Sequence, residues 1–116
     1  MNEETAPQPV PSEDEAVIAL ATSLLDAARE GDGAMLLPLV DQGAPVNLSD
    51  STGNSLLMLA AYHGHADLVH ELAARGADVD RINDRGQSPL AGAAFKGFTE
   101  VAEQLVAAGA DPDLGI

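Results

Sequence analysis

Apolar residues recur along this chain at helical spacing, in short segments that glycine separates. The first segment follows Ser12, and within it Leu20, Leu24 and Ala28 fall on one face of a helix. Ser12 and Glu15 have the spacing of a capping box, in which each side chain accepts a hydrogen bond from the backbone N–H of the other residue. The pattern therefore predicts one long amphipathic helix that begins at Ser12.

The same pattern repeats along the chain with a period of 33 residues. Repetition at such a period is typical of solenoids, in which each repeat is one supersecondary unit. The segments that match at this offset are Gly53–His65 with Gly86–Phe98, Gly76–Asp78 with Gly109–Asp111, Ala27–Ala28 with Ala60–Ala61, Gly31 with Gly64, and Gly43–Ala44 with Gly76–Ala77. They predict three helical units, near residues 19–51, 52–84 and 85–114.

Each unit is expected to contain two short helices and a polar excursion. In the middle unit the first helix covers residues 55–62, Gly64 forms a tight turn, and the second helix covers residues 66–74 before Gly76 ends it. Ser55 stands where a helix N-cap belongs. One unit cannot bury both of its helices, so neighbouring units must stack to form the core, and about three repeats are needed. The predicted fold class is therefore all-α.

Several of these positions together resemble the ankyrin repeats. That family's pattern matches Ser88-Pro89-Leu90, Ala60-Ala61, Gly64-His65 and Gly76-Ala77-Asp78-Val79-Asp80, and the resemblance covers about residues 19–114. It implies an ankyrin-repeat solenoid of about three 33-residue helix-turn-helix repeats, with β-hairpin fingers at residues 43–54 and 76–87. It also implies that a partner protein binds the concave face formed by the finger tips and the first helices. The small, Ala-rich chain is similar to bacterial members of the family.

The resemblance also assigns residues to that concave surface. The implied protein-binding residues are Arg29 and Glu30 in the first repeat, Ser51, Thr52, Asn54, Tyr62 and His63 in the second, and Asp84, Arg85, Gln87, Phe95 and Lys96 in the third. Tyr62 and Phe95 stand out, because aromatic and arginine side chains are common interface hot spots. A competing interpretation makes Phe95 and Phe98 packing residues, and single exposed apolar residues are common on protein surfaces.

The chain departs from the family pattern at several places. Met58 and Ala91 stand where the family usually has histidine, which removes a polar contact between neighbouring turns. Pro38 lies inside the second predicted helix of the first repeat, where its missing N–H is expected to delay or kink that helix. After Asp111 only five residues follow, so the third finger is expected to be unfinished and the C-terminal cap missing. The last repeat is then expected to leave part of an apolar face open, which a second copy, a partner protein or the rest of a longer chain would cover.

The charge of the chain limits the classes of partner that it is expected to bind. The sequence has 19 Asp and Glu residues against 5 Lys and Arg residues, a net charge of −14. A chain this acidic disfavours nucleic acids and anionic membranes, and it favours a partner protein with a basic patch. Residues 1–11 hold three prolines and no apolar periodicity, which predicts a disordered tail ahead of a domain at residues 12–116. With no cysteine and no secretion signal, a cytoplasmic location is expected.

Catalytic and metal-binding chemistry finds little support in the sequence. The histidines are His63, His65 and His70, and without cysteine or a matched carboxylate spacing they predict no metal site. No phosphate-binding glycine loop or nucleophile-elbow serine is present. We therefore expect no enzyme activity, no cofactor, and a protein–protein interaction module with a regulatory or accessory role. Two alternatives stay open: a structural element that self-assembles, at least weakly, through the last repeat instead of staying monomeric, and an acidic inhibitor of a nucleic-acid enzyme.

Overall fold

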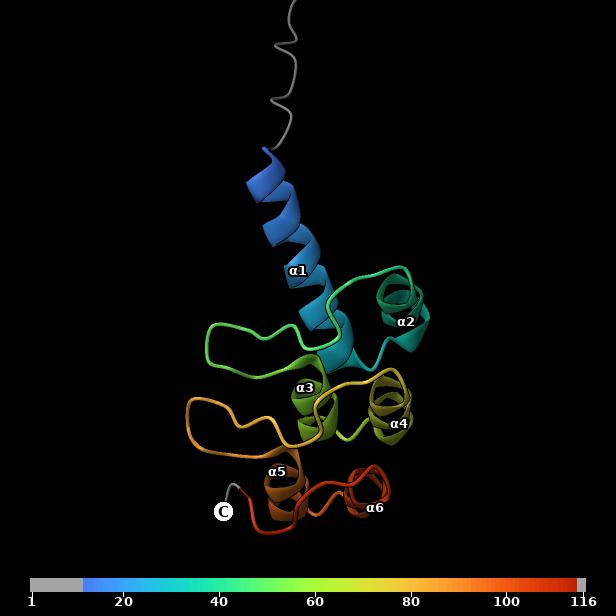
Figure 1. The fold of residues 1–116 in the computed structure, drawn as a ribbon, viewed down its shortest axis with the longest axis vertical. Helices are drawn as coiled ribbons and strands as arrows, with labels where there is room; N and C mark the ends of the chain where they lie inside the picture. The colour runs from blue at the N-terminus through green and yellow to red at the C-terminus, as the bar shows by residue number, and fades with distance from the viewer. Residues whose placement is uncertain (1–11, 115–116) are drawn as a thin grey trace, which may run out of the picture.

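The computed structural model describes residues 12–114 as a stack of helix pairs (Figure 1). The helices within this range are α1 (Glu13–Glu30), α2 (Gly33–Asp41), α3 (Leu56–Tyr62), α4 (Ala66–Ala74), α5 (Pro89–Lys96) and α6 (Thr99–Ala107). Each odd-numbered helix forms a pair with the even-numbered helix that follows it. The tail expected at residues 1–11 lies outside the described residues.

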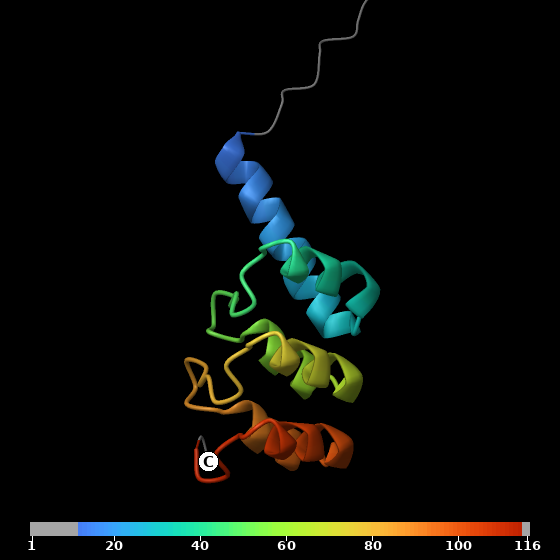
Figure 2. The ribbon, with the colours of Figure 1, turned by 45° about the vertical axis from the view of Figure 1, so that its right-hand side comes forward.

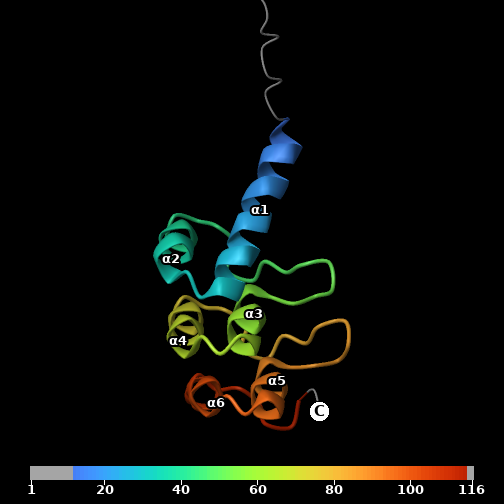
Figure 3. The same ribbon diagram turned by 180° about the vertical axis from the view of Figure 1, so that it is seen from behind.

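The three pairs stack in two layers. α1, α3 and α5 form one layer, and α2, α4 and α6 form the other, as Figures 1 and 2 show. Two loops, which we call the first finger (residues 43–54) and the second finger (residues 76–87), project on the side of α3 and α5, and Figure 3 shows them from behind. This arrangement confirms the predicted all-α repeat fold.

The two fingers end in tight turns instead of the expected β-hairpins. Within residues 12–114, strand-like pairing is limited to one isolated antiparallel β-bridge, between Ser49 and Ser55. The first finger closes through the N–H of Asp50, which donates to the carbonyl of Asn54 at 2.9 Å. The carboxylate of Asp50 also accepts the backbone N–H groups of Thr52 and Asn54, each at 2.9 Å. Because a side chain satisfies these N–H groups, the tip needs no strand ladder.

The helix starts follow the signals in the sequence. Ser12 and Glu15 form the expected capping box: the Ser12 hydroxyl accepts the Glu15 N–H at 3.1 Å, and Glu15 Oε1 accepts the Ser12 N–H at 2.9 Å. Ser55 and Ser88 cap α3 and α5, and each hydroxyl accepts a backbone N–H at 3.1 Å. Both of these serines are buried. Each cap satisfies an N–H that has no partner inside its own helix.

Pro38 lies within α2 and does not delay its start, contrary to our expectation. α2 begins at Gly33, well ahead of the proline. Asp32 caps this start by accepting the backbone N–H of Met35 at 3.1 Å. Pro38 lacks the N–H that would bond to the carbonyl of Ala34, but both residues are exposed, so water can reach that carbonyl. The exposed position is what makes the proline tolerable here.

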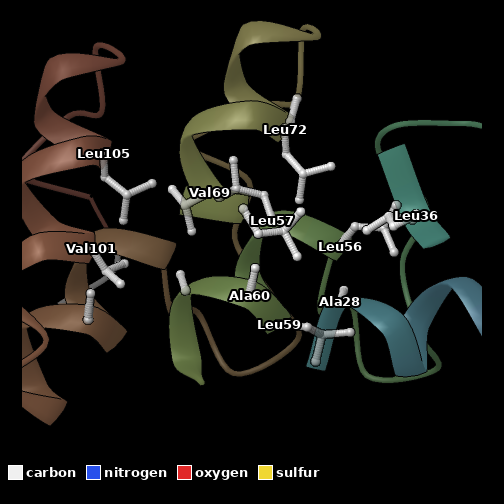
Figure 4. Packing of buried hydrophobic residues seen from close by; sticks show 14 of the residues in the cluster. Ala28, Leu36, Leu56, Leu57, Leu59, Ala60, Val69, Leu72, Val101 and Leu105 are labelled. Carbon is white, nitrogen blue, oxygen red and sulfur yellow. The ribbon is translucent and has the colours of Figure 1, made fainter. Parts of the chain in front are cut away.

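The core lies between the two layers and continues from repeat to repeat (Figure 4). The large side chains that are fully buried include Leu36, Leu56, Leu57, Val69, Leu72, Val101 and Leu105. Ala27, Ala60 and Ala93, at the 33-residue spacing, are also buried. Such small side chains allow the helices of neighbouring repeats to approach closely. Burial of each large aliphatic side chain contributes about 1.5–3 kcal/mol, so the stacked leucines are the main source of stability.

The N-terminal half of α1 extends beyond the stack (Figures 1 and 2). Leu24 and Ala28 are buried, as their spacing predicts, but Leu20 is 47% exposed. Val17 and Ile18 are exposed as well. The apolar face of α1 is therefore longer than the part of it that α2 and α3 cover. None of the helices within residues 12–114 is long and apolar enough to cross a membrane.

Candidate functional site

A groove opens between the end of α3, the second finger and α5. It has a volume of about 560 Å³, and the residues that line it are Tyr62, Arg85, Gln87, Ala91, Gly92, Phe95 and Lys96. Five of these residues, namely Tyr62, Arg85, Gln87, Phe95 and Lys96, belong to the binding surface that the family resemblance implies. The structure therefore brings together predicted residues from three separate segments of the chain.

The repeat period positions the two aromatic residues of this groove. Tyr62 ends α3, and Phe95 occupies the equivalent place in α5, 33 residues later. The second finger contributes Arg85 and Gln87, which the buried Asn83 holds in place. Asn83 Oδ1 accepts the backbone N–H of Arg85 at 2.9 Å and that of Gln87 at 3.0 Å. The groove walls are thus fixed by helix stacking on one side and by a closed turn on the other.

The Tyr62 ring fits beside α5 because residue 92 has no side chain. A Cβ atom at Gly92 would overlap the ring of Tyr62. The ring instead lies across α5, and the Tyr62 hydroxyl donates a hydrogen bond to the carbonyl of Ser88 at 3.3 Å. Burial raises the pKa of the Tyr62 phenol above its ordinary value, and the positive charge of Arg85 partly opposes this effect. Tyr62 is therefore a partly buried side chain that connects the second and third repeats.

The two phenylalanines have different environments. Phe98 is half-buried and packs against the core. Phe95 is 90% exposed at the rim of the groove. Lys96 lies close to Tyr62 and Phe98: its Nζ donates to the carbonyl of Tyr62 at 2.9 Å and lies 5.9 Å and 6.0 Å from the centres of the Tyr62 and Phe98 rings. The packing interpretation therefore describes Phe98, whereas Phe95 presents a free aromatic surface.

The remaining predicted residues lie outside the groove. Asn54 links the two fingers, because its Oδ1 accepts a hydrogen bond from Asn83 Nδ2 at 2.9 Å. Asp84 donates its backbone N–H to the carbonyl of Thr52 at 3.0 Å, and its carboxylate lies against Gly53. The others are dispersed: Ser51 is exposed in the first finger, His63 Nδ1 lies 2.8 Å from the carbonyl of Leu59, Arg29 is ion-paired with Asp26 and Asp50, and Glu30 is exposed at the end of α1.

Asp50 organises the first finger, and sequence reasoning did not single it out. Its carboxylate accepts the two backbone N–H groups of the turn and also the Thr52 hydroxyl, at 2.9 Å. Burial acts to raise the pKa of the Asp50 carboxyl, but the hydrogen bonds from Asn54 and Thr52 outweigh it and lower the pKa below its usual range. Arg29 adds an ion pair at 3.6 Å. This carboxylate is therefore a structural anchor for the first finger.

Gly92 and Ala91 are the lining residues that sequence reasoning missed. A signal for Gly92 exists in the repeat alignment, because the 33-residue offset places it opposite Leu59. Leu59 is buried, so a change to glycine at the equivalent position indicates open space in the next repeat. The alignment does not show that the Tyr62 ring of the preceding repeat fills part of that space.

Two of the three histidines bond to backbone carbonyls. His65 Nε2 lies 2.7 Å from the carbonyl of Arg29 and so connects the first two repeats. Gly31 leaves room for this ring, because a Cβ there would lie 2.5 Å from His65 Nδ1, and the φ of Gly31 is +74°. Across residues 12–114, no three His, Asp or Glu side chains are grouped so that they could hold a metal ion.

Known proteins share the repeats of this chain. The family model of ankyrin repeats, in three copies, matches residues 24–115. A protein of Pseudomonas aeruginosa that is named for its ankyrin repeats is similar, with 52% identity over 40 residues. That match covers 34% of this chain and 23% of the Pseudomonas protein. The similarity to this relative is thus confined to a stretch little longer than one repeat.

Proposed function

Because this chain belongs to the ankyrin-repeat family, we propose that it binds a partner protein through its concave face. Ankyrin repeats are generally protein–protein interaction modules. We place the centre of the contact at the groove between α3, the second finger and α5, and we assign the protein a regulatory or accessory role. The polar finger residues Thr52, Asn54 and Asp84 would form the rim of the contact, in keeping with the polar rims of protein interfaces.

The observation that carries this proposal is the exposed aromatic side chain of Phe95. It is 90% exposed, and it stands in a groove beside Tyr62 and Arg85. Tyrosine and arginine are enriched among the residues that dominate binding energy, especially where they line a pocket that a partner can desolvate. An exposed phenylalanine beside Tyr62 and Arg85 is better explained by a contact with a partner than by packing within the chain.

The charge of the chain gives the proposed partner a second property. With a net charge of −14, the protein attracts positively charged surfaces over a distance of about one Debye length, 8–10 Å. We therefore propose a partner with a basic patch that faces the acidic chain outside the groove. Binding of this kind associates faster at low salt.

A pull-down from lysate tests the proposal. The bait is the full chain, compared with the groove variant Tyr62→Ala/Arg85→Ala/Phe95→Ala. A control variant, Val17→Ala/Ile18→Ala/Arg81→Ala, removes two exposed apolar side chains and one arginine away from the groove. We expect a protein that the unaltered chain and the control retain and that the groove variant loses. Retention of the same proteins by all three baits would refute the proposal, provided that circular dichroism shows each bait to be folded at the temperature of the pull-down.

Self-assembly is a second candidate function, and one observation favours it. Val106 of α6 is 58% exposed and lines a shallow apolar hollow with Ala102 and Ala107. A second copy could cover this face of the last repeat. Sedimentation velocity of the unaltered chain and of Val106→Glu separates the two functions, because only self-assembly predicts a concentration-dependent mass that the substitution abolishes.

A further inference from the structure

The groove has a charge opposite to that of the molecule around it. The chain carries 19 acidic and 5 basic residues. Two of the basic residues, Arg85 and Lys96, line the groove, and no carboxylate of residues 12–114 does. The groove is therefore lined by positive charge, although the chain as a whole is acidic.

These two positive charges are not neutralised by acids within the described residues. The ion pairs found in residues 12–114 use Arg29 and Arg75, and neither Arg85 nor Lys96 takes part in one. The nearest acid in sequence is Asp84, but its carboxylate lies against Gly53 in the first finger. Lys96 donates one hydrogen bond, to the carbonyl of Tyr62. Since an ammonium group has three N–H donors, two remain for a ligand.

Between these charges the groove is apolar and of limited size. Phe95 and the ring of Tyr62 flank it, and Ala91 and Gly92 form its floor. A volume of about 560 Å³ lies within the range of sites that enclose one small ligand, roughly 300–1,000 Å³. It therefore suits a few side chains of an extended segment better than the broad surface of a folded domain.

From these features we propose that the groove binds a short segment of the partner protein that carries a carboxylate beside an aromatic or large aliphatic side chain. The apolar side chain lies against Phe95 and Tyr62, and the carboxylate lies between Arg85 and Lys96. A guanidinium presents paired N–H donors that match a carboxylate. This inference rests on the proposed function and adds the chemistry of the bound segment. The segment that enters the groove is acidic, whereas the proposed basic patch of the partner lies outside the groove.

Charge also decides which macromolecule supplies the segment. Two copies of this chain, each with a net charge of −14, repel one another, so a second copy is disfavoured. A basic segment in the groove would place its positive charge against Arg85 and Lys96, which destabilises the complex. A partner protein with an acidic, apolar segment satisfies both the charges and the aromatic surfaces.

A displayed library of random 12-residue peptides tests the inference. It is selected in parallel on the full unaltered chain, on Arg85→Glu/Lys96→Glu, and on Arg81→Glu as a control that changes one exposed arginine outside the groove. Both groove substitutions are at exposed positions, and circular dichroism checks that all three proteins are folded during the selection. We expect Asp or Glu next to Phe, Tyr, Trp or Leu among peptides retained by the unaltered chain and by the control. The selected peptides should bind Arg85→Glu/Lys96→Glu roughly 10- to 100-fold more weakly, as expected for lost hydrogen bonds to charged groups.

Each other outcome has a distinct meaning. Basic peptides whose binding requires Tyr62 and Phe95 would overturn the acidic preference but leave the groove as the binding site. Acidic peptides that bind Arg85→Glu/Lys96→Glu equally well would overturn the placement of the carboxylate. If no peptide is enriched, the inference is overturned, and the pull-down with the groove variant decides separately whether the proposed function stands. A dimer that Arg85→Glu/Lys96→Glu dissociates would identify a second copy as the occupant and overturn the choice of a partner protein.

Discussion

The contact between Tyr62 and Gly92 predicts a substitution whose effect on stability changes sign with its neighbour. Gly92 lies inside α5, where alanine is favoured over glycine by about 0.8–1 kcal/mol. In the unaltered chain, however, a Cβ at this position displaces the Tyr62 ring. Displacement removes the hydrogen bond to Ser88, about 0.5–1.5 kcal/mol, and the apolar contact of a half-buried ring, about 1 kcal/mol. Gly92→Ala should therefore destabilise the unaltered chain by about 1 kcal/mol.

In a Tyr62→Ala background the same substitution should stabilise the protein by about 1 kcal/mol, because no ring occupies the space. The two effects together give a coupling free energy of about 2 kcal/mol. Urea denaturation of the four proteins, followed by circular dichroism, measures each free energy of unfolding. A coupling below about 0.5 kcal/mol, or a stabilising Gly92→Ala in both backgrounds, would show that the ring does not lie over residue 92.

Three further predictions concern the groove, the first finger and the core. Tyr62, the one tyrosine of a chain without tryptophan, should titrate above the usual pKa of about 10, so its contribution to stability is complete below pH 10 and is lost as the pH rises through its folded pKa. Absorbance at 295 nm measures this pKa, and Arg85→Ala should raise it further. No change in the pKa would exclude the proximity of Arg85 to Tyr62. Asp50→Ala should cost about 1–3 kcal/mol at pH 7 in urea denaturation, and the cost should shrink as the pH falls through the depressed pKa of Asp50; a cost independent of pH would show that its charge is not the anchor. Leu57→Ala should cost about 2–5 kcal/mol because the side chain is fully buried, whereas Val106→Ala, at a 58% exposed site, should cost under about 1 kcal/mol; equal losses would contradict the assigned core.

The repeats and their helix starts could be predicted because both depend on local sequence patterns. The 33-residue period and the Ser12–Glu15 capping box depend on residues that are close in sequence or recur at one spacing. Leu20 shows where this reasoning stops. Its spacing places it on the apolar face of α1, but its exposure depends on where the neighbouring helices end. Pro38 failed as a helix-start signal for the same reason, since its tolerance depends on exposure to water.

The groove could be predicted only in part. The family resemblance indicates that Tyr62, Arg85 and Phe95 face one side, because equivalent positions of stacked repeats align. Whether they form a groove depends on Gly92, whose missing side chain matters only because Tyr62 comes from the preceding repeat. A contact between neighbouring repeats, such as that of Tyr62 with Gly92, depends on a pair of residues that differs from one repeat boundary to the next. The same holds for Asp50, whose role comes from a hydrogen-bond network and not from the repeat pattern.

The binding role of the groove is tested most directly by the affinity of the partner protein captured with the unaltered chain. Isothermal titration calorimetry would compare the unaltered chain, the groove variant Tyr62→Ala/Arg85→Ala/Phe95→Ala and the control Val17→Ala/Ile18→Ala/Arg81→Ala. Loss of even one hot-spot residue costs about 2 kcal/mol or more, which is roughly 30-fold in Kd. We predict at least that loss for the groove variant and less than about threefold for the control. Equal affinities for all three proteins would contradict the account.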